Sequence, residues 1–350
     1  MTLPFSIVDP HVHLWDPLNT PRPASPFVRL LGRWPRLLHR AALGVLPAPV
    51  LGFLGRPDYM IAPHMPADVR DAAAPLQVDT LVHVETKWTG REGPAGETRW
   101  LESLRCEAVG LRIGATVGHA DLTSKHLAAV LDAHAQASAK FRGIRQMASR
   151  HPSRRIMAFS RQTNLYANAD FLRGFELLAQ RGLRFDAWVY SNQLNDVAAL
   201  AQRFPQTAIV LDHLGTPVGA GGPAGDVGTT ESERANILAT WRDALAKVAE
   251  NKNVHAKISG LAMPVLGFGF HTRSTPPSAD ELTERFSPFV RNALNVFGVE
   301  RCFFASNFPM DKVSAPYHHI FQAFARFAVE HGPEAPRALL RDNALRFYGI

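Results

Sequence analysis

Cysteine is scarce in this chain, whose 350 residues include only Cys106 and Cys302. Two cysteines cannot build the dense disulfide network of small secreted domains, so a disulfide scaffold is excluded and a reducing, cytoplasmic location is expected. The first nine residues lack a basic segment followed by a long apolar stretch, so we expect no secretory signal.

Long hydrophobic runs are also missing. The most apolar window, 41–54, contains Pro47 and Pro49. It is shorter than the roughly 20 residues that a spanning helix needs, so we expect no membrane span. Apolar residues nevertheless make up 46% of the chain, which excludes intrinsic disorder. A chain of this length fits one α/β barrel, and we predict a single domain over 1–350.

Basic residues outnumber acidic ones, 38 to 31, which gives a formal charge of +7. The sequence contains no run of five basic residues and no nucleic-acid-binding motif, so a nucleic-acid partner is not expected. Two interpretations stay open: an anionic small-molecule substrate, and an arginine-rich surface without a functional role.

Eight short runs rich in Val, Ile, Phe and Ala alternate with helical patterns. This alternation predicts βαβ units and a parallel sheet. Eight units fit an α/β fold of the closed (β/α)8 TIM barrel type, with an open doubly wound sheet as the alternative. The expected strands are 5–8, 79–85, 112–117, 143–146, 184–190, 208–212, 254–259 and 302–305, and the expected helices are 124–139, 168–181, 194–203, 231–250, 279–297 and 317–330.

The connection between the first two predicted strands is unusually long, and we interpret 17–77 as an insertion. Its part 26–46 has the pattern of one basic amphipathic helix that contains Arg29, Arg33, Arg36 and Arg40. A lid over the catalytic face and a contact between copies in a homo-oligomer are both compatible with it. Association with a membrane surface is a third interpretation.

Polar side chains follow the predicted strands at the point where each strand ends. In a parallel barrel these ends converge on one pocket, so we expect the side chains to meet there. Three neutral imidazoles suit a divalent ion, zinc above all, and a carboxylate could complete the site. A metal-free site that only binds substrate fits the same residues equally. The candidate metal ligands are His11, His13, His213 and Glu85; the other polar candidates are Arg142, Arg145, Tyr190, Lys257, Ser306 and Asn307.

Several motifs together resemble the amidohydrolase superfamily, in the branch of TIM-barrel hydrolases that includes sugar lactonases and 2-pyrone-4,6-dicarboxylate lactonase. The resemblance spans nearly the whole chain and is weakest between residues 14 and 78. It implies a distorted barrel that hydrolyses a lactone or a related cyclic ester or amide. The motifs are residues 7–16 (IVDPHVHLWD), 141–145 (FRGIR), 211–215 (LDHLG), 257–261 (KISGL), 297–298 (FG) with Arg301, and 306–309 (SNFP).

The match to this superfamily includes His11, His13 and His213, but it has two departures. Tyr190 stands near the place of the superfamily's strand-five histidine, and Asn307 replaces its strand-eight aspartate, usually the base. Branch members that similarly lack the strand-five histidine act without metal, which lowers the expectation of a metal here.

We expect His11, His13, His213, Glu85 and Asn307 to form the catalytic set. In this hypothesis a water is activated by His213, by Glu85 or by a bound metal. Two interpretations of Asp311 stay open: a displaced substitute for the missing base, and, favoured here, the partner of a nearby arginine in a salt bridge.

The expected substrate site comprises Arg142, Arg145, Tyr190, Lys257 and Ser306. The two arginines would hold a substrate carboxylate in a bidentate fork. Three alternatives remain: a lyase such as a decarboxylase, a lactone isomerase, and a binding protein that has lost catalysis, since Asn307 cannot take a proton.

Overall fold

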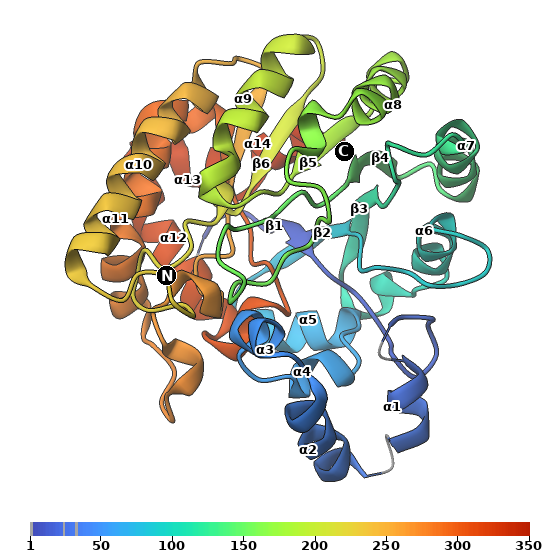
Figure 1. Cartoon of the computed structure of the whole chain (residues 1–350), viewed down its shortest axis with the longest axis horizontal. Helices are drawn as coiled ribbons and strands as arrows, with labels where there is room; N and C mark the ends of the chain where they lie inside the picture. Colours follow the sequence, from blue (N-terminus) through green and yellow to red (C-terminus); the bar gives the residue numbers. More distant parts are fainter. Residues whose placement is uncertain (1–2, 24, 32–33) are drawn as a thin grey trace.

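The computed structural model describes residues 3–23, 25–31 and 34–350. Eight parallel strands pair in chain order, each with the next. Val12 pairs in parallel with Phe308, just beyond the last strand, and closes the sheet. The predicted (β/α)8 barrel is therefore confirmed (Figure 1). Its strands are β1 (Ile7–Val12), β2 (Val78–Val84), β3 (Arg112–Gly118), β4 (Phe141–Arg145), β5 (Arg184–Ala187), β6 (Ile209–Asp212), β7 (Val254–Ile258) and β8 (Cys302–Phe304).

The first strand differs most from its predicted bounds, because it runs on to Val12 instead of ending at residue 8. All six of its residues are buried, including the polar Asp9. Asp9 accepts hydrogen bonds from the Ser306 N–H at 3.0 Å and from the Tyr317 hydroxyl at 2.8 Å. Buried polar residues with hydrogen-bond partners elsewhere in the fold interrupt the apolar run from which a strand is predicted, so the second half of this strand was missed.

Helices surround the barrel, and the six helices predicted between residues 124 and 330 follow their ranges closely, whereas the two short helices after residue 334 were not predicted. The Ser278 hydroxyl accepts a hydrogen bond from the Glu281 N–H and caps the long helix that begins at Ala279. The helices are α1 (Ser25–Leu31), α2 (Pro35–Val45), α3 (Ala48–Leu54), α4 (Asp58–Ile61), α5 (Pro66–Ala73), α6 (Ala95–Glu102), α7 (Leu127–Ala137), α8 (Ala169–Gln180), α9 (Leu194–Arg203), α10 (Glu231–Ala249), α11 (Ala279–Phe297), α12 (Tyr317–Val329), α13 (Ala335–Arg337) and α14 (Asn343–Tyr348).

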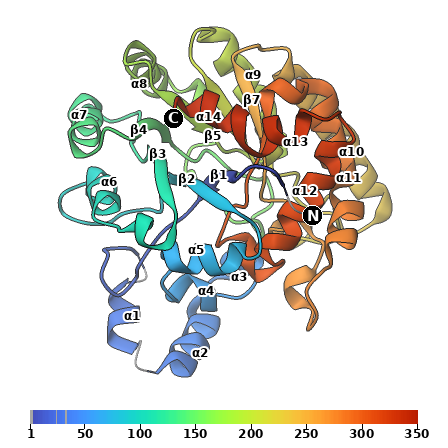
Figure 2. The same ribbon diagram turned by 180° about the vertical axis from the view of Figure 1, so that it is seen from behind.

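The segment between β1 and β2 holds five short helices, α1 to α5. The single helix predicted over 26–46 is wrong, because α1 ends at Leu31 and α2 begins at Pro35. Proline favours a new helix start and disfavours helical geometry in the residue before it. Arg29 lies in α1, Arg36 and Arg40 lie in α2, and Arg33 lies outside the described residues. Both views show α1 and α2 beyond α3, α4 and α5, away from the strands (Figures 1 and 2).

The C-terminal helix α14 covers the N-terminal ends of the strands (Figure 2). Phe347 and Tyr348 pack into a buried cluster with strand residues that include Val8, Val210 and Phe303. This packing seals the end of the barrel opposite the predicted site. Among the described residues, no helix combines the length and apolarity that a bilayer crossing requires.

Candidate active site

His11 and His13 lie at the carboxyl end of β1, and their Nε2 atoms are 3.2 Å apart. The Nδ1 atom of His13 is 2.8 Å from the carbonyl oxygen of Val84. A carbonyl oxygen can only accept, so His13 donates from Nδ1, and its Nε2 keeps a lone pair when the ring is neutral.

His213 follows β6 and has a left-handed backbone, with φ of 55°. Its ring lies 4.6 Å from that of His11, centre to centre. Its Nδ1 is 2.8 Å from the Ser259 hydroxyl oxygen. A Cβ atom on Gly260 would come within 2.7 Å of the His213 ring, so the glycine makes room for the imidazole. The three predicted histidines therefore meet at the carboxyl end of the barrel.

Asp212 joins this group, although its side chain was not predicted as part of the site. Its carboxylate is fully buried, and no described residue donates a hydrogen bond of good geometry to either oxygen. His11, Asp212 and His213 each offer one atom, and these atoms lie within 4.8 Å of one another. Two imidazoles and a carboxylate are a donor set that zinc accepts, so this cluster could hold a metal ion.

Burial keeps these histidines uncharged. The pKa of His213 falls to about 3, chiefly through burial; Asp212 opposes this fall, and the cations Arg145 and Lys257 add to it. Burial and Lys257 also place the pKa of His11 well below its usual value. Neutral imidazole is the form that accepts a proton or binds a metal.

Arg145 and Glu85 form a buried ion pair beside the histidines. The Arg145 Nε and Nη2 atoms lie 2.9 Å and 2.8 Å from the same Glu85 oxygen, and Nη1 is 3.3 Å from His11 Nε2. Burial alone would raise the pKa of Glu85, but Arg145 and further polar contacts lower it. Glu85 is thus the partner of Arg145 and lies outside the cluster of His11, Asp212 and His213.

Lys257 lies fully buried beneath the histidines. Its Nζ is 2.6 Å from Asp186, 2.9 Å from Asp212 and 3.2 Å from His11 Nδ1. Tyr348 of α14 also donates a hydrogen bond to Asp186. The ammonium is therefore fully engaged by the protein, which favours a supporting role over the predicted contact with substrate.

The side chains of Asn307 and Ser306 form hydrogen bonds with groups other than the histidine rings. Asn307 has a φ of 58°, and its side-chain amide donates to Asp311 at 3.1 Å. The Ser306 hydroxyl accepts a hydrogen bond from the Phe308 N–H. Burial raises the pKa of Asp311 to about 8. Asp311 is thus a buried acid held by Asn307, the residue in the place of the superfamily's aspartate.

Two predicted residues are not brought to the cluster. Arg142 lies near the start of β4, at the opposite end of the strand, and donates to the Ala139 carbonyl. Tyr190 is buried, and its hydroxyl donates to the Met157 carbonyl at 2.8 Å. Trp188, two residues earlier, packs edge-on against His213 with ring centres 5.7 Å apart. Its position after an apolar strand was the only sequence signal for this contact.

Helix α3 covers the site through aromatic contacts. Phe53 packs against Phe159 and Trp188, with ring centres 4.9 Å and 5.9 Å apart. A hollow of about 430 Å³ lies beside Phe53 and Met157. The exposed fractions of His11, His13 and His213 are only 0%, 5% and 2%, so the covered site is closed to solvent.

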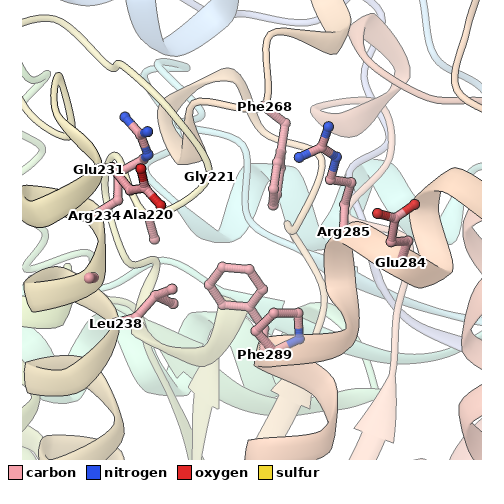
Figure 3. Close-up of a pocket in the computed structure, with 11 residues that line it drawn as sticks. Ala220, Gly221, Glu231, Arg234, Leu238, Phe268, Glu284, Arg285 and Phe289 are labelled. Atoms are coloured by element: carbon pink, nitrogen blue, oxygen red, sulfur yellow. The ribbon is translucent and has the colours of Figure 1, made fainter.

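A separate hollow of about 360 Å³ lies between α10 and α11. Figure 3 shows Phe268 and Phe289 in it, with Arg234 and Arg285 on opposite sides. None of the site histidines lines it, so it is not part of the cluster.

The chain is similar to several known proteins over most of its length. An uncharacterized protein, y4mH, of Sinorhizobium fredii is 31% identical over 99% of both chains. An L-fucono-1,5-lactonase of Burkholderia multivorans is 29% identical over 80% of this chain and 85% of its own. A crystal structure of a zinc-bound amidohydrolase from Burkholderia multivorans is 25% identical, with a TM-score of 0.70, and the match covers 99% of this chain and 100% of that one. The family described as amidohydrolase matches residues 8–350. The chain therefore belongs to the amidohydrolase family of hydrolases.

Proposed function

We propose that the chain hydrolyses a lactone, or a related cyclic ester or amide, that carries an anionic group. The observation that carries this proposal is the convergence of neutral His11 and His213 with Asp212 beside the Arg145 guanidinium. The likeness to L-fucono-1,5-lactonases supports a lactone as the substrate class.

His213 is the base in this proposal. Its Nδ1–H donates to the Ser259 hydroxyl, whose own proton faces the Lys257 carbonyl at 3.5 Å. The Nε2 atom then keeps a lone pair that can take a proton from the attacking water and return it to the ring oxygen as the acyl C–O bond breaks. Asp212 stabilises the imidazolium that forms. Such general-base assistance contributes about 10²–10⁴-fold to the rate.

Arg145 stabilises the charge that develops on the carbonyl oxygen during attack. Glu85 fixes the guanidinium through two nitrogen atoms, so it is oriented before the substrate arrives. A fixed donor in a buried site stabilises a developing oxyanion strongly because no reorganisation is needed.

Lys87 receives the anionic group of the substrate. It stands two residues beyond Glu85, and its Nζ lies 5.0 Å from the Phe159 ring, which packs on Trp188. Lys87 is exposed and forms no ion pair with any residue that the structure describes. Arg145 and Lys257, the other cations near the site, already have carboxylate partners. Lys87 is therefore the cation to which we assign the anionic group.

The donor set also fits one zinc ion, which His11, Asp212 and His213 would hold. When bound, zinc acidifies its water to a pKa near 7. In that state the His213 lone pair is a ligand and not the base. Protein dialysed against a chelator separates the two states: retained activity supports His213 as the base, whereas activity that returns only with zinc overturns this assignment.

The function is tested with paired lactones that differ only in the presence of a carboxylate, using a pH indicator. We expect one acid released per ring opened, faster for the anionic member of each pair. His213→Asn should lower kcat at least about 100-fold, whereas exposed His126→Asn serves as the control.

The same assay also detects the products that would contradict lactone hydrolysis. Release of carbon dioxide would identify a lyase, and formation of a ring isomer without acid would identify an isomerase. Binding of the lactone without turnover would identify a binding protein. Lys87→Met should remove the preference for the anionic lactone while leaving turnover of the neutral one. An unchanged preference would overturn the role of Lys87 alone, whereas equal rates for the two members of each pair in the wild type would overturn the anionic assignment.

A further inference from the structure

Exposed apolar side chains gather in one part of the insertion. Of the seven large apolar side chains found exposed among the described residues, six fall between residues 18 and 45. The exception is Val329 on α12. We call these six residues the apolar patch: Leu18, Phe27, Leu30, Trp34, Leu43 and Val45.

The most exposed members lie on α1 and α2 and at the junction between them. Phe27, Leu30, Trp34 and Val45 are 65%, 72%, 58% and 81% exposed. Both views show these two helices at the edge of the molecule, on the far side of α3, α4 and α5 from the strands (Figures 1 and 2). A patch of this kind marks an interaction site, because scattered single exposures are the ordinary case.

The charge around the apolar patch has a single sign. Residues 17–57 contain six arginines, no lysine and no acidic residue, so this stretch carries +6 of the net +7. Arg29 and Arg40 are exposed beside the apolar patch on α1 and α2. Arg22 is half-buried over Trp15 and donates to the Thr86 carbonyl, and Arg56 lies near Asp58, so neither adds a free surface cation.

The positive charge discriminates between two possible binding partners of the apolar patch, a second copy of the chain and an anionic surface. A second copy of the chain would bring two equally positive segments together, and like charges at an interface oppose association. An anionic surface meets both features at once. Basic residues beside exposed Trp, Phe and Leu on short helices are the pattern of segments that lie in the bilayer interface.

We propose that the apolar patch docks the enzyme on the surface of a bilayer that contains anionic phospholipids. Phe27, Leu30 and Trp34 enter the headgroup region, and Arg29 and Arg40 contact lipid phosphates. The barrel and its active site stay outside the bilayer. This proposal does not depend on the identity of the lactone.

Cosedimentation of the full chain with vesicles tests the proposal. One set of vesicles is phosphatidylcholine alone, and the other is equal parts phosphatidylcholine and phosphatidylglycerol. We expect binding to the second set that weakens as salt rises, because screening shortens the reach of surface charge. Equal binding to neutral vesicles, or none to anionic ones, would overturn the proposal.

Variants separate the apolar and the charged contributions. Phe27→Glu with Leu30→Glu should abolish binding, with Val329→Glu as the matched control. Arg29→Gln and Arg40→Gln should each weaken binding about 5-fold, with exposed Arg242→Gln as the control. Circular dichroism and the melting temperature check that each variant is folded.

Light scattering without lipid measures whether the chain is a monomer or a dimer in solution. A monomer that binds anionic vesicles supports the proposal. A dimer that dissociates in the Phe27→Glu, Leu30→Glu variant would show that the apolar patch joins two copies, and would overturn it. Vesicle binding that these substitutions leave unchanged would also overturn it.

Discussion

At the scale of residues, the site is a charge network closed to water. Arg145 and Lys257 face Glu85, Asp186 and Asp212, and every one of these side chains is at most 5% exposed. Burial raises the pKa of Asp186 to about 6, against the lowering effect of Lys257. Each charge in such a network depends on its partners, because an unpaired ion in the interior costs several kcal/mol.

Lys257→Met should therefore destabilise the fold strongly. It leaves Asp186 and Asp212 without their shared cation, and we expect a loss of about 3–5 kcal/mol in the free energy of unfolding. Urea denaturation of the variant and the wild type measures this difference in the free energy of unfolding. Adding Asp186→Asn should recover part of the loss, and exposed Lys252→Met should change little. A wild-type stability in Lys257→Met would show that the pairs contribute nothing.

Asp311 should make stability depend on pH. Its pKa of about 8 in the fold exceeds the unfolded value of roughly 3.9. Between these values only the folded chain holds the proton, so stability falls as pH rises, by at most about 1.4 kcal/mol per unit. Thermal unfolding from about pH 5 to about pH 8 should show a smaller fall in Asp311→Asn than in the wild type. Exposed Asp170→Asn should keep the wild-type slope, and identical slopes in all three would contradict the assignment.

At the scale of elements, α3 packs on Trp188, the residue whose ring contacts His213. Phe53 is the one residue of α3 that is fully buried, and it covers Trp188 through direct aromatic contact. The helix has only seven residues, and isolated helices of that length are marginal in water. Its position therefore depends on this packing, and we propose that a substrate displaces α3 to reach His213.

A reversible cross-link tests that role. With Phe53→Cys and Phe159→Cys in one chain, a bifunctional thiol reagent with a reducible spacer should join α3 to the loop after β4 and stop lactone turnover, and a reductant should restore it. The parent ring centres are 4.9 Å apart, so the two side chains face each other. Each single variant is the control, since neither can form the link. Full activity in the cross-linked double variant would show that α3 need not move.

At the scale of the whole molecule, one end of the barrel holds the candidate site and the other end is closed by packing. The carboxyl end holds the histidines, and the amino end is closed by the last helix. Tyr348 connects the two ends, because its hydroxyl reaches Asp186, which in turn holds Lys257 beneath His11. The C-terminal helix therefore supports the site from the opposite end of the barrel.

Phe347→Ala should destabilise the whole barrel. Phe347 is 5% exposed and packs on His255 and Phe303, so we expect a loss of about 3–5 kcal/mol. Phe27→Ala, at a side chain that is 65% exposed, should leave the unfolding midpoint unchanged. Chemical denaturation compares the two. Equal stabilities would contradict the role given to α14.

The sequence predicted the strands and their polar ends well because both are local signals. Short apolar runs mark strands that are buried on both faces, and parallel strands bring their following residues to one edge. The same rule predicts that His11, His13 and His213 meet, and their rings do lie together. It failed for Arg142, since a residue at the start of a strand faces the opposite end of the barrel.

The sequence by itself determined the barrel, the family and the histidine cluster, because periodic patterns and strand-end motifs are written along the chain. Only the tertiary structure decided how those residues are used. It paired Glu85 with Arg145, placed Lys257 between Asp186 and Asp212, and left the oxygens of Asp212 facing the histidines. These contacts join residues far apart in sequence, and which buried charges become partners depends on distances that only the folded chain sets.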